Sequence, residues 1–514
     1  MSFKTALEQL PRVEAEWLRP LDPGSYRLTS FVLLRLLGLV YTLAFLSLSN
    51  QLGPLIGADG LLPASQFLEK SARYFGDSAS AWTSMPTLFW LDASDATMQA
   101  LAHLGLLLSV LLLCGIANVF QLFALWLIYL SFNSVGQLFY GYGWEILLLE
   151  SGFLAIFLAP LGTRQAPSPA ALIWLYRWVL FRVILGAGLI KVRGDACWLD
   201  LTCMSYHYET QPIPNPLSWY FHHLPPIVHK LSVAATHFIE LIVPFFIFAP
   251  RRLRHIAGLI QISFQGLLIL SGNLSWLNYL TIALCIPCFD DRALERVLPR
   301  RLSAYIQRDP PADIGTPRRL GIYTLCILVF YLSSAPIQNM VSPDQTMNRS
   351  YDPLHLVNTY GAFGHIGKKR YEIVIKGTND HPANPQARWR EYEFHGKPGD
   401  INRRPALISP YHYRLDWQIW FAAMSDYKSN PWLVHFIYKL LQGNAGALGL
   451  LAENPFGATP PTFILAELYE YEFTSWDEDT EAWWQRKRLG IWLGPLSLGE
   501  PALGEFLQHY GWGQ

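Results

Sequence analysis

The sequence has few charged residues, and their signs balance. Only 15% of its 514 residues are Asp, Glu, Lys or Arg, whereas 51% are hydrophobic. A composition this apolar excludes an ordinary soluble enzyme of this size and predicts a polytopic membrane protein. Lys plus Arg equals Asp plus Glu at 39 each, so no excess of positive charge indicates a nucleic-acid partner.

The sequence also lacks the short motifs of common enzyme classes. There is no G-x-S-x-G elbow, which excludes a lipase of the common hydrolase fold. There is no Walker A motif and no G-x-G-x-x-G, so we expect no nucleotide cofactor. No H-E-x-x-H or tight Cys/His spacing occurs, and we expect no metal site. No catalytic residue can be assigned.

Cysteine is scarce, with six residues in the chain. Cys114, Cys285 and Cys326 lie in apolar runs and Cys288 at the end of one, where we expect small buried hydrophobic side chains. The first 17 residues lack the apolar core of a signal peptide. We therefore expect the first membrane span to act as an uncleaved targeting signal.

Long apolar runs are abundant, and each is near the roughly 20 residues that cross a bilayer. They lie near 30–50, 98–117, 119–138, 144–160, 171–190, 232–250, 255–272, 274–289 and 320–336. The pattern predicts a multi-span domain over 1–340 with about nine helical spans. It also predicts two extracytoplasmic loops, at 51–97 and 191–231.

Basic residues indicate the orientation of these spans. If the N-terminus, with Lys4, Arg12 and Arg19, is cytoplasmic, then Arg164, the cluster at 251–254 and the basic stretch at 292–319 share its side. The region after the last span then lies outside the cytoplasm, in a periplasm or an ER lumen.

Residues 341–514 are richer in charge and predict an extracytoplasmic β-rich (α+β) domain. Alternating patterns predict strands at 368–377, 390–397 and 467–474, and the segments 416–428 and 431–443 predict helices. Ser475 and Glu478 form a capping-box pattern, which predicts a helix that ends in basic residues 486–488.

Six charged side chains fall inside apolar runs: Arg35, Glu145, Glu150, Arg177, Arg182 and Glu240. The fourth and fifth spans are antiparallel neighbours, which places Glu150 at the depth of Arg182 and Glu145 at that of Lys191. The set indicates either packing ion pairs with snorkelling arginines, or a polar intramembrane cavity for a lipid headgroup.

The loop between the fifth and sixth spans is proline-stiffened and aromatic, without helical or strand periodicity. Its candidate client- or ligand-binding residues are Tyr206, His207, Tyr208, Glu209, Trp219, His222 and His223. Rigid aromatic side chains beside a carboxylate suit a binding surface. The alternative is that these side chains pack under the C-terminal domain.

Cys197 and Cys203 share this loop at a C-x5-C spacing. On the oxidising side of a membrane, this spacing favours a structural disulfide. A catalytic redox pair is the alternative, but it usually has C-x-x-C at a helix start.

The amino-acid sequence of the loop resembles that of one protein family. RGDACWLDLTCMSYHYETQPIPNPLSWYFHHLP at 193–225 is similar to the signature of lipase maturation factors, as are 141–160 and 389–424. The resemblance implies an ER membrane protein with a lumenal C-terminal domain that helps secreted lipases to fold. The compact chain ends in HYGWGQ, without an ER-retrieval signal, so we expect a bacterial member in the inner membrane with that domain in the periplasm.

Two functions remain open at this point. In one, the protein is a non-catalytic maturation factor whose C-terminal β domain and central loop engage a secreted client outside the cytoplasm, with membrane lipid as a further partner. In the other, it is an intramembrane enzyme or a lipid- or redox-handling protein that uses the polar spans and the His-rich loop. A cavity lined by Glu150, Arg182 and loop histidines favours the second function.

Overall fold

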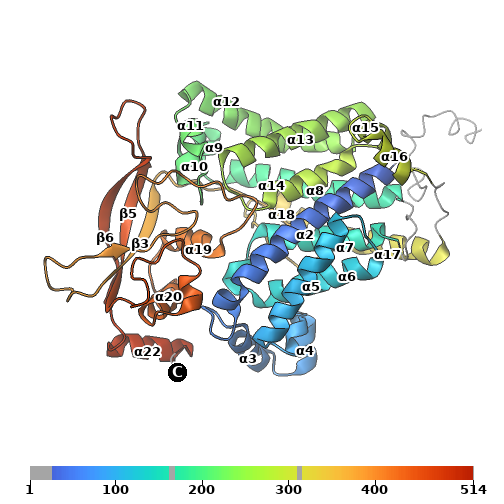
Figure 1. Ribbon diagram of the computed structural model, residues 1–514. Helices are drawn as coiled ribbons and strands as arrows, with labels where there is room; N and C mark the ends of the chain where they lie inside the picture. The colour runs from blue at the N-terminus through green and yellow to red at the C-terminus, as the bar shows by residue number, and fades with distance from the viewer. Residues whose placement is uncertain (1–25, 161–167, 309–314, 513–514) are drawn as a thin grey trace, which may run out of the picture.

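The computed structural model describes residues 26–160, 168–308 and 315–512. The N-terminal basic residues and Arg164 of the orientation argument lie outside these ranges. The described chain has two halves, a bundle of long helices and an α+β half built on one sheet (Figure 1). This is the predicted architecture of a helical membrane domain followed by a β-rich domain.

Six described helical segments are long and apolar enough to cross a membrane. They are α2 (Arg27–Ile56), α5 (Asp95–Leu113), α8 (Ala170–Arg193), Pro226–Phe248, α13 (Arg251–Ser271) and Thr316–Val341. The other three predicted spans are also helical but shorter: α6 (Val119–Val135), α7 (Gly143–Leu158) and Leu277–Cys288. The expected count of nine is therefore approximate.

The segment Pro226–Phe248 is not one regular helix. It begins as α12 (Pro226–His237), forms a π-helical turn at η4 (Phe238–Ile242) and continues as the 3-10 helix η5 (Val243–Phe248). Pro244 has no backbone N–H to donate, which disfavours a continuous α-helix here. Gly188 of α8 lies so close that an added Cβ would be 2.9 Å from the Cβ of Glu240. The small residue therefore lets the irregular turn sit against α8.

The predicted loop at 191–231 contains more helix than its sequence pattern indicates. Its short helices are α9 (Ala196–Leu199), α10 (Met204–Thr210) and α11 (Ser218–His222). The sequence shows no helical period here, because these helices of four to seven residues are too short to show one.

The C-terminal half contains an antiparallel sheet of order β4-β3-β5-β6. Its strands are β3 (Arg370–Thr378), β4 (Arg390–Glu391), β5 (Phe463–Phe473) and β6 (Trp484–Leu496). The strands predicted at 368–377 and 467–474 are confirmed, whereas the one at 390–397 shrinks to two residues. A short pair, β1 (Arg349–Ser350) with β2 (Asn358–Thr359), precedes the sheet.

Helices cover the sheet on the side of the bundle (Figure 1). The predicted helices are present as α19 (Arg414–Ala422) and α20 (Pro431–Leu441), and α22 (Pro501–Tyr510) follows the sheet. The helix predicted after Ser475 was wrong. Glu478 does accept a hydrogen bond from the Ser475 N–H at 3.2 Å, but the chain then turns into β6, where Arg488 pairs across the sheet with Glu467 at 2.6 Å.

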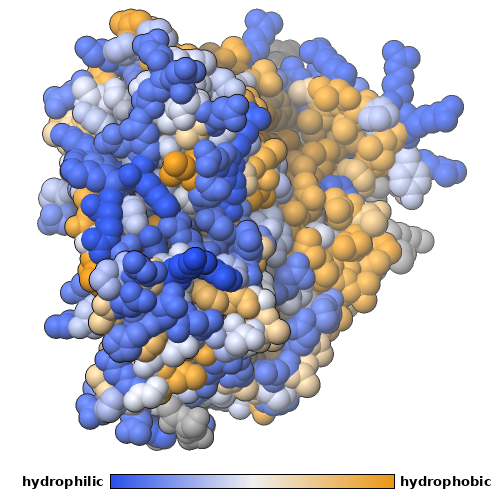
Figure 2. Space-filling view, turned by 60° about the vertical axis from the view of Figure 1, so that its left-hand side comes forward, coloured by the Kyte–Doolittle hydropathy of each residue, from blue (hydrophilic) through white to orange (hydrophobic). Residues whose placement is uncertain are grey.

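Side-chain hydropathy divides the surface in the same way (Figure 2). Hydrophobic residues gather over the helical half and hydrophilic residues over the half that carries the sheet. The short helices α15 (Asp291–Leu294) and α16 (Arg300–Ile306), in the basic stretch, lie at the end of the bundle farthest from the sheet (Figure 1). The hydrophobic bundle therefore lies between two polar ends, the sheet half at one end and the basic helices at the other.

Candidate functional site

The candidate site is the junction between the central loop and the C-terminal sheet. A disulfide between Cys197 and Cys203 closes a small ring within the loop. Both cysteines are buried in a small cluster with Trp198, Tyr208 and Ile366. Because this packing shields the sulfur atoms, the structure favours a bridge that shapes the loop over a redox centre.

The seven predicted binding residues do not form one exposed surface. His207, Tyr208, Glu209 and Trp219 are buried, and Tyr206, His222 and His223 are half-buried. The ring of His207 packs edge-on against Phe363. Most of this group therefore packs beneath the C-terminal half, which is the second of the two readings of the sequence.

Arg370 of β3 fastens the loop to the sheet. It donates hydrogen bonds to the backbone oxygens of Glu209 at 3.0 Å and Pro212 at 2.9 Å, and also to that of Gln211. Its guanidinium forms an ion pair with Glu372, whose second oxygen lies 3.0 Å from Lys397. Sequence analysis missed this buried network, because the alternation of β3 reads as one polar and one apolar face, whereas both faces are covered.

Glu209 lies at the centre of the junction. Its Oε2 accepts a hydrogen bond from the Phe473 N–H at 2.7 Å and lies 3.8 Å from His222 Nε2. Burial raises the pKa of Glu209 to about 7 and lowers the pKa of His222 to about 4. At neutral pH His222 is therefore uncharged, and its contact with Glu209 is not an ion pair.

We expect Glu209→Gln to remove a pH dependence of stability. The raised pKa of Glu209 stabilises the folded protein below about pH 4.5, and this stability is lost as pH rises through about 7. Glutamine keeps an acceptor for the Phe473 N–H and does not titrate. When unfolding is measured from pH 5 to 8, the free energy of unfolding of the variant should rise relative to that of the wild type by at most about 3 kcal/mol. The lowered pKa of His222 affects both proteins alike. If the stability of the two proteins changed with pH in the same way, this role of Glu209 would be contradicted.

One part of the junction is exposed and aromatic. We call Trp219, Tyr220, His223, Trp476 and Trp483 the outer aromatic cluster. The ring of Trp219 lies 4.3 Å from that of Trp476 and 5.8 Å from that of Trp483, and its Nε1 donates to the Thr474 oxygen at 3.0 Å. Trp476 is 60% exposed and Tyr220 41% exposed, beside the exposed acidic residues Asp477, Asp479 and Glu481.

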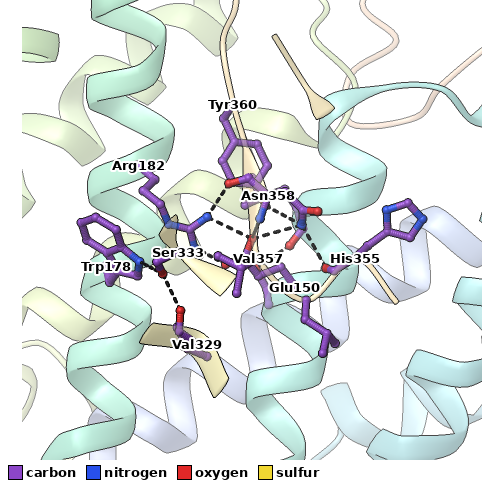
Figure 3. A network of polar contacts seen from close by, with 12 residues as sticks. Glu150, Trp178, Arg182, Val329, Ser333, His355, Val357, Asn358 and Tyr360 are labelled. Atoms are coloured by element: carbon purple, nitrogen blue, oxygen red, sulfur yellow. Dashed lines mark hydrogen bonds and ion pairs between the residues drawn. The ribbon is translucent and has the colours of Figure 1, made fainter. Parts of the chain in front are cut away.

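The span residue Glu150 is held by groups from both halves of the protein (Figure 3). It forms a buried ion pair with Arg182, as the sequence predicts. Its Oε2 also accepts from the Asn358 N–H at 3.0 Å and from the Tyr360 hydroxyl at 2.7 Å. Arg182 donates to the Asn358 oxygen, so the start of the C-terminal half is bound between two spans.

Glu145 makes a second bond between the halves, but with a different partner from the predicted one. It pairs with Arg414 of α19 at 2.8 Å and accepts from the Tyr129 hydroxyl. Arg414 is buried, and its guanidinium stacks 3.7 Å from the Tyr140 ring centroid. The predicted match of Glu145 with Lys191 was wrong, because the carboxylate of Glu145 pairs with Arg414, which lies 269 positions further along the chain.

The other predicted span charges have partners within the helical half of the protein. Lys191 Nζ lies 2.6 and 2.7 Å from the two carboxylate oxygens of Glu240. Arg177 donates to the Pro287 oxygen at 2.9 Å and to the Tyr26 hydroxyl at 2.8 Å. Arg35 lies 4.7 Å from the Phe31 ring centroid. Within the part of the chain that the structure describes, no three His, Cys, Asp or Glu side chains are grouped as metal ligands would be.

Comparison with known proteins identifies the two halves. The family model described as the lipase maturation factor transmembrane domain matches residues 28–296, and that of the lipase maturation factor C-terminal domain matches residues 356–493. This chain belongs to the lipase maturation factor family. The resemblance of the signature loop is thereby confirmed, and the protein is an integral membrane protein.

Relatives match along almost the whole lipase maturation factor chain. Lipase maturation factor 1 of Mus musculus is 46% identical over 533 residues, which cover 98% of this chain and 92% of the relative. The Homo sapiens protein of that name is 46% identical over 520 residues, covering 96% and 91%. Lipase maturation factor 2 of Xenopus laevis is 31% identical over 611 residues, covering 95% and 85%. No solved structure matches.

The two regions of the lipase maturation factor are joined by one buried ion pair, between Glu145 and Arg414, and by hydrogen bonds that link Glu150 and Arg182 to segment 358–360. Glu145 and Glu150 lie in the transmembrane match, whereas Asn358, Tyr360 and Arg414 lie in the C-terminal match. The charged residues of α7 therefore bind the C-terminal region to the spans.

Proposed function

We propose that this chain is a membrane-bound maturation factor for secreted lipases. The observation that carries the proposal is similarity along 98% of the chain to a protein named lipase maturation factor 1. The absence of a nucleophile elbow in the sequence agrees with a role in folding a lipase rather than in hydrolysis. The burial of Glu150 and Arg182 among protein groups gives the alternative intramembrane enzyme no support.

The proposal is tested by co-expression in cells whose own lipase maturation factors have been deleted. A secreted lipase is produced with and without this full-length chain, and its activity is measured per amount of lipase protein. We expect the chain to raise this specific activity at least tenfold. Equal specific activity in both cell lines would overturn the function.

We propose further that residues 341–514 lie outside the cytoplasm and that the spans occupy the ER membrane or a bacterial inner membrane. The basic stretch with α15 and α16 lies at the end of the bundle opposite the sheet (Figure 1). Positively charged segments remain on the cytoplasmic side of membranes. This orientation presents the outer aromatic cluster to secreted proteins.

Within this function, we assign client binding to the outer aromatic cluster. It combines the exposed indole ring of Trp476 and the half-buried ring of Trp483, held on the buried ring of Trp219, with an adjoining acidic segment that favours a basic client surface. The buried residues His207, Tyr208 and Glu209 contribute by fixing the shape of the loop beneath it. Of the predicted binding residues, Trp219, His222 and His223 lie at or beside this surface.

We expect Trp476→Ala to lower lipase maturation by about tenfold or more, because an aromatic hot spot contributes about 2 kcal/mol. Its melting temperature should stay near wild type, since the side chain is largely exposed. Trp82→Ala is the matched control: Trp82 is 39% exposed and lies on α4 (Ser78–Ser84), far from α11 (Figure 1). Equal loss in both variants would remove the assignment.

A further inference from the structure

A cavity of about 360 Å³ lies where the helical bundle meets the C-terminal half. Helices α7, α8 and α13 each contribute residues from the end near the sheet, and α14 (Leu277–Cys285) contributes its first turns. Segment 360–365 and α19 also line the cavity, together with the central loop, the π-helical turn η4 and residues 347–348. By the assignment of the spans, the cavity lies at the depth of the outer leaflet.

Most of the wall is hydrophobic. Val183, Ile184 and Ala187 of α8 face Phe264 and Leu268 of α13 across the cavity. Trp420 and Phe421 of α19 also line it. Phe421 and Met347 are cavity residues that are also exposed, so the cavity reaches the molecular surface there. Such a wall complements a hydrocarbon chain.

Two groups of buried polar residues lie in the wall, which also includes Thr236, Thr281, Asn348 and His365. One consists of the ion pair between Lys191 and Glu240, together with His207. The other consists of Gln265 and Asn278, whose side chains share a hydrogen bond of 2.7 Å. All five of these residues are buried.

The polar groups carry no free charge. Lys191 is neutralised by two contacts with Glu240 of 2.6 and 2.7 Å. Burial lowers the pKa of His207 to about 4, so its ring is neutral at pH 7. An anionic head group would have to break the buried ion pair, which costs several kcal/mol. Hydroxyl, ester or amide groups can be bound without that cost.

Two buried polar atoms support a ligand at this site. His207 Nδ1 and Asn278 Oδ1 have no hydrogen-bond partner in the protein, although both residues are buried and line the cavity. A buried polar group without a hydrogen-bond partner destabilises the folded protein. A single hydroxyl-bearing head group bound beside either residue would supply the missing hydrogen-bond partner.

We propose that this cavity binds a neutral single-chain amphiphile from the outer leaflet, with one hydrocarbon chain and a hydroxyl-bearing head. The volume is at the lower end of the range for small-molecule sites, about 300–1,000 Å³. It fits one chain and is too small for a helix or strand of a client. The site goes beyond the proposed maturation function and does not depend on it.

The test uses the full-length protein in detergent with a photoreactive diazirine analogue of monooleoylglycerol. Peptide mapping should place the label on α8, α13 or segment 360–365. Unlabelled monooleoylglycerol should compete at least tenfold better than oleate. Monooleoylglycerol should also raise the melting temperature of the wild-type protein.

Ala187→Phe fills the cavity without removing a hydrogen bond and should lower labelling at least tenfold. Leu185→Phe on the same helix is the control, because Leu185 is half-buried and is not a cavity residue. If Ala187→Phe is poorly folded, the melting shift and the mapped position in wild type decide. Equal labelling of all three proteins, or equal competition by oleate, would overturn the proposal. So would a wild type that takes no label while Ala187→Phe weakens lipase maturation, since the cavity would then hold part of a client.

Discussion

Replacing Glu150 with alanine is expected to remove most of the folded protein from the membrane. The change leaves Arg182 buried at membrane depth without its carboxylate, and it takes an acceptor from the Asn358 N–H and the Tyr360 hydroxyl. Breaking a buried ion pair on one side typically costs about 3–5 kcal/mol. Arg182→Ala should be as harmful, because it leaves the carboxylate unpaired. Size-exclusion chromatography of a fluorescent fusion measures the yield.

The double variant Glu150→Leu with Arg182→Met is the control. It removes both charges and keeps the volume, so much of the yield should return. Recovery should be incomplete, because Asn358 and Tyr360 still lack their acceptor. A double variant no better than the single variants would contradict the ion-pair account. A double variant that folds well but no longer matures a lipase would show that these charges do more than hold the structure.

A reporter that is active only outside the cytoplasm should be active when fused after residue 345 and inactive when fused after residue 305. The two points lie on either side of the segment Thr316–Val341, so one crossing separates them. The effect is all-or-none, and a reporter active only in the cytoplasm should give the reverse pattern. The opposite result at either point would overturn the orientation inferred from the basic residues.

Sequence reasoning predicted the parts of this molecule that depend on near neighbours. Each apolar run is helical, because a run of this length must satisfy its own backbone in a membrane. The pairing of Glu150 with Arg182 followed from two antiparallel spans with a short connection. The pairing of Glu145 could not be found in this way, because Arg414 comes from a distant helix and no local pattern marks it.

The same limit explains the error after Ser475. The capping contact with Glu478 is present, but basic residues 486–488 belong to strand β6 and not to the end of a helix. Arg486 of β6 lies 2.7 Å from Glu391 of β4 in the same sheet, and Arg488 lies 2.6 Å from Glu467 on the neighbouring strand β5. Cross-strand ion pairs and the favourable charges of a helix end look alike in sequence. Burial of His207 and Trp219 likewise depends on Phe363 and Thr474, which lie far along the chain.

The central claim is that a secreted lipase binds the face of the protein that carries the outer aromatic cluster. Its most direct test is site-specific photo-crosslinking in living cells, with a photoreactive amino acid at position 476 or at position 305. Tyr305 is also exposed, and it lies at the opposite end of the bundle. We predict that newly made lipase crosslinks to position 476 and not to position 305. A crosslink at 305 alone, or none at 476 while the lipase still matures, would contradict the claim.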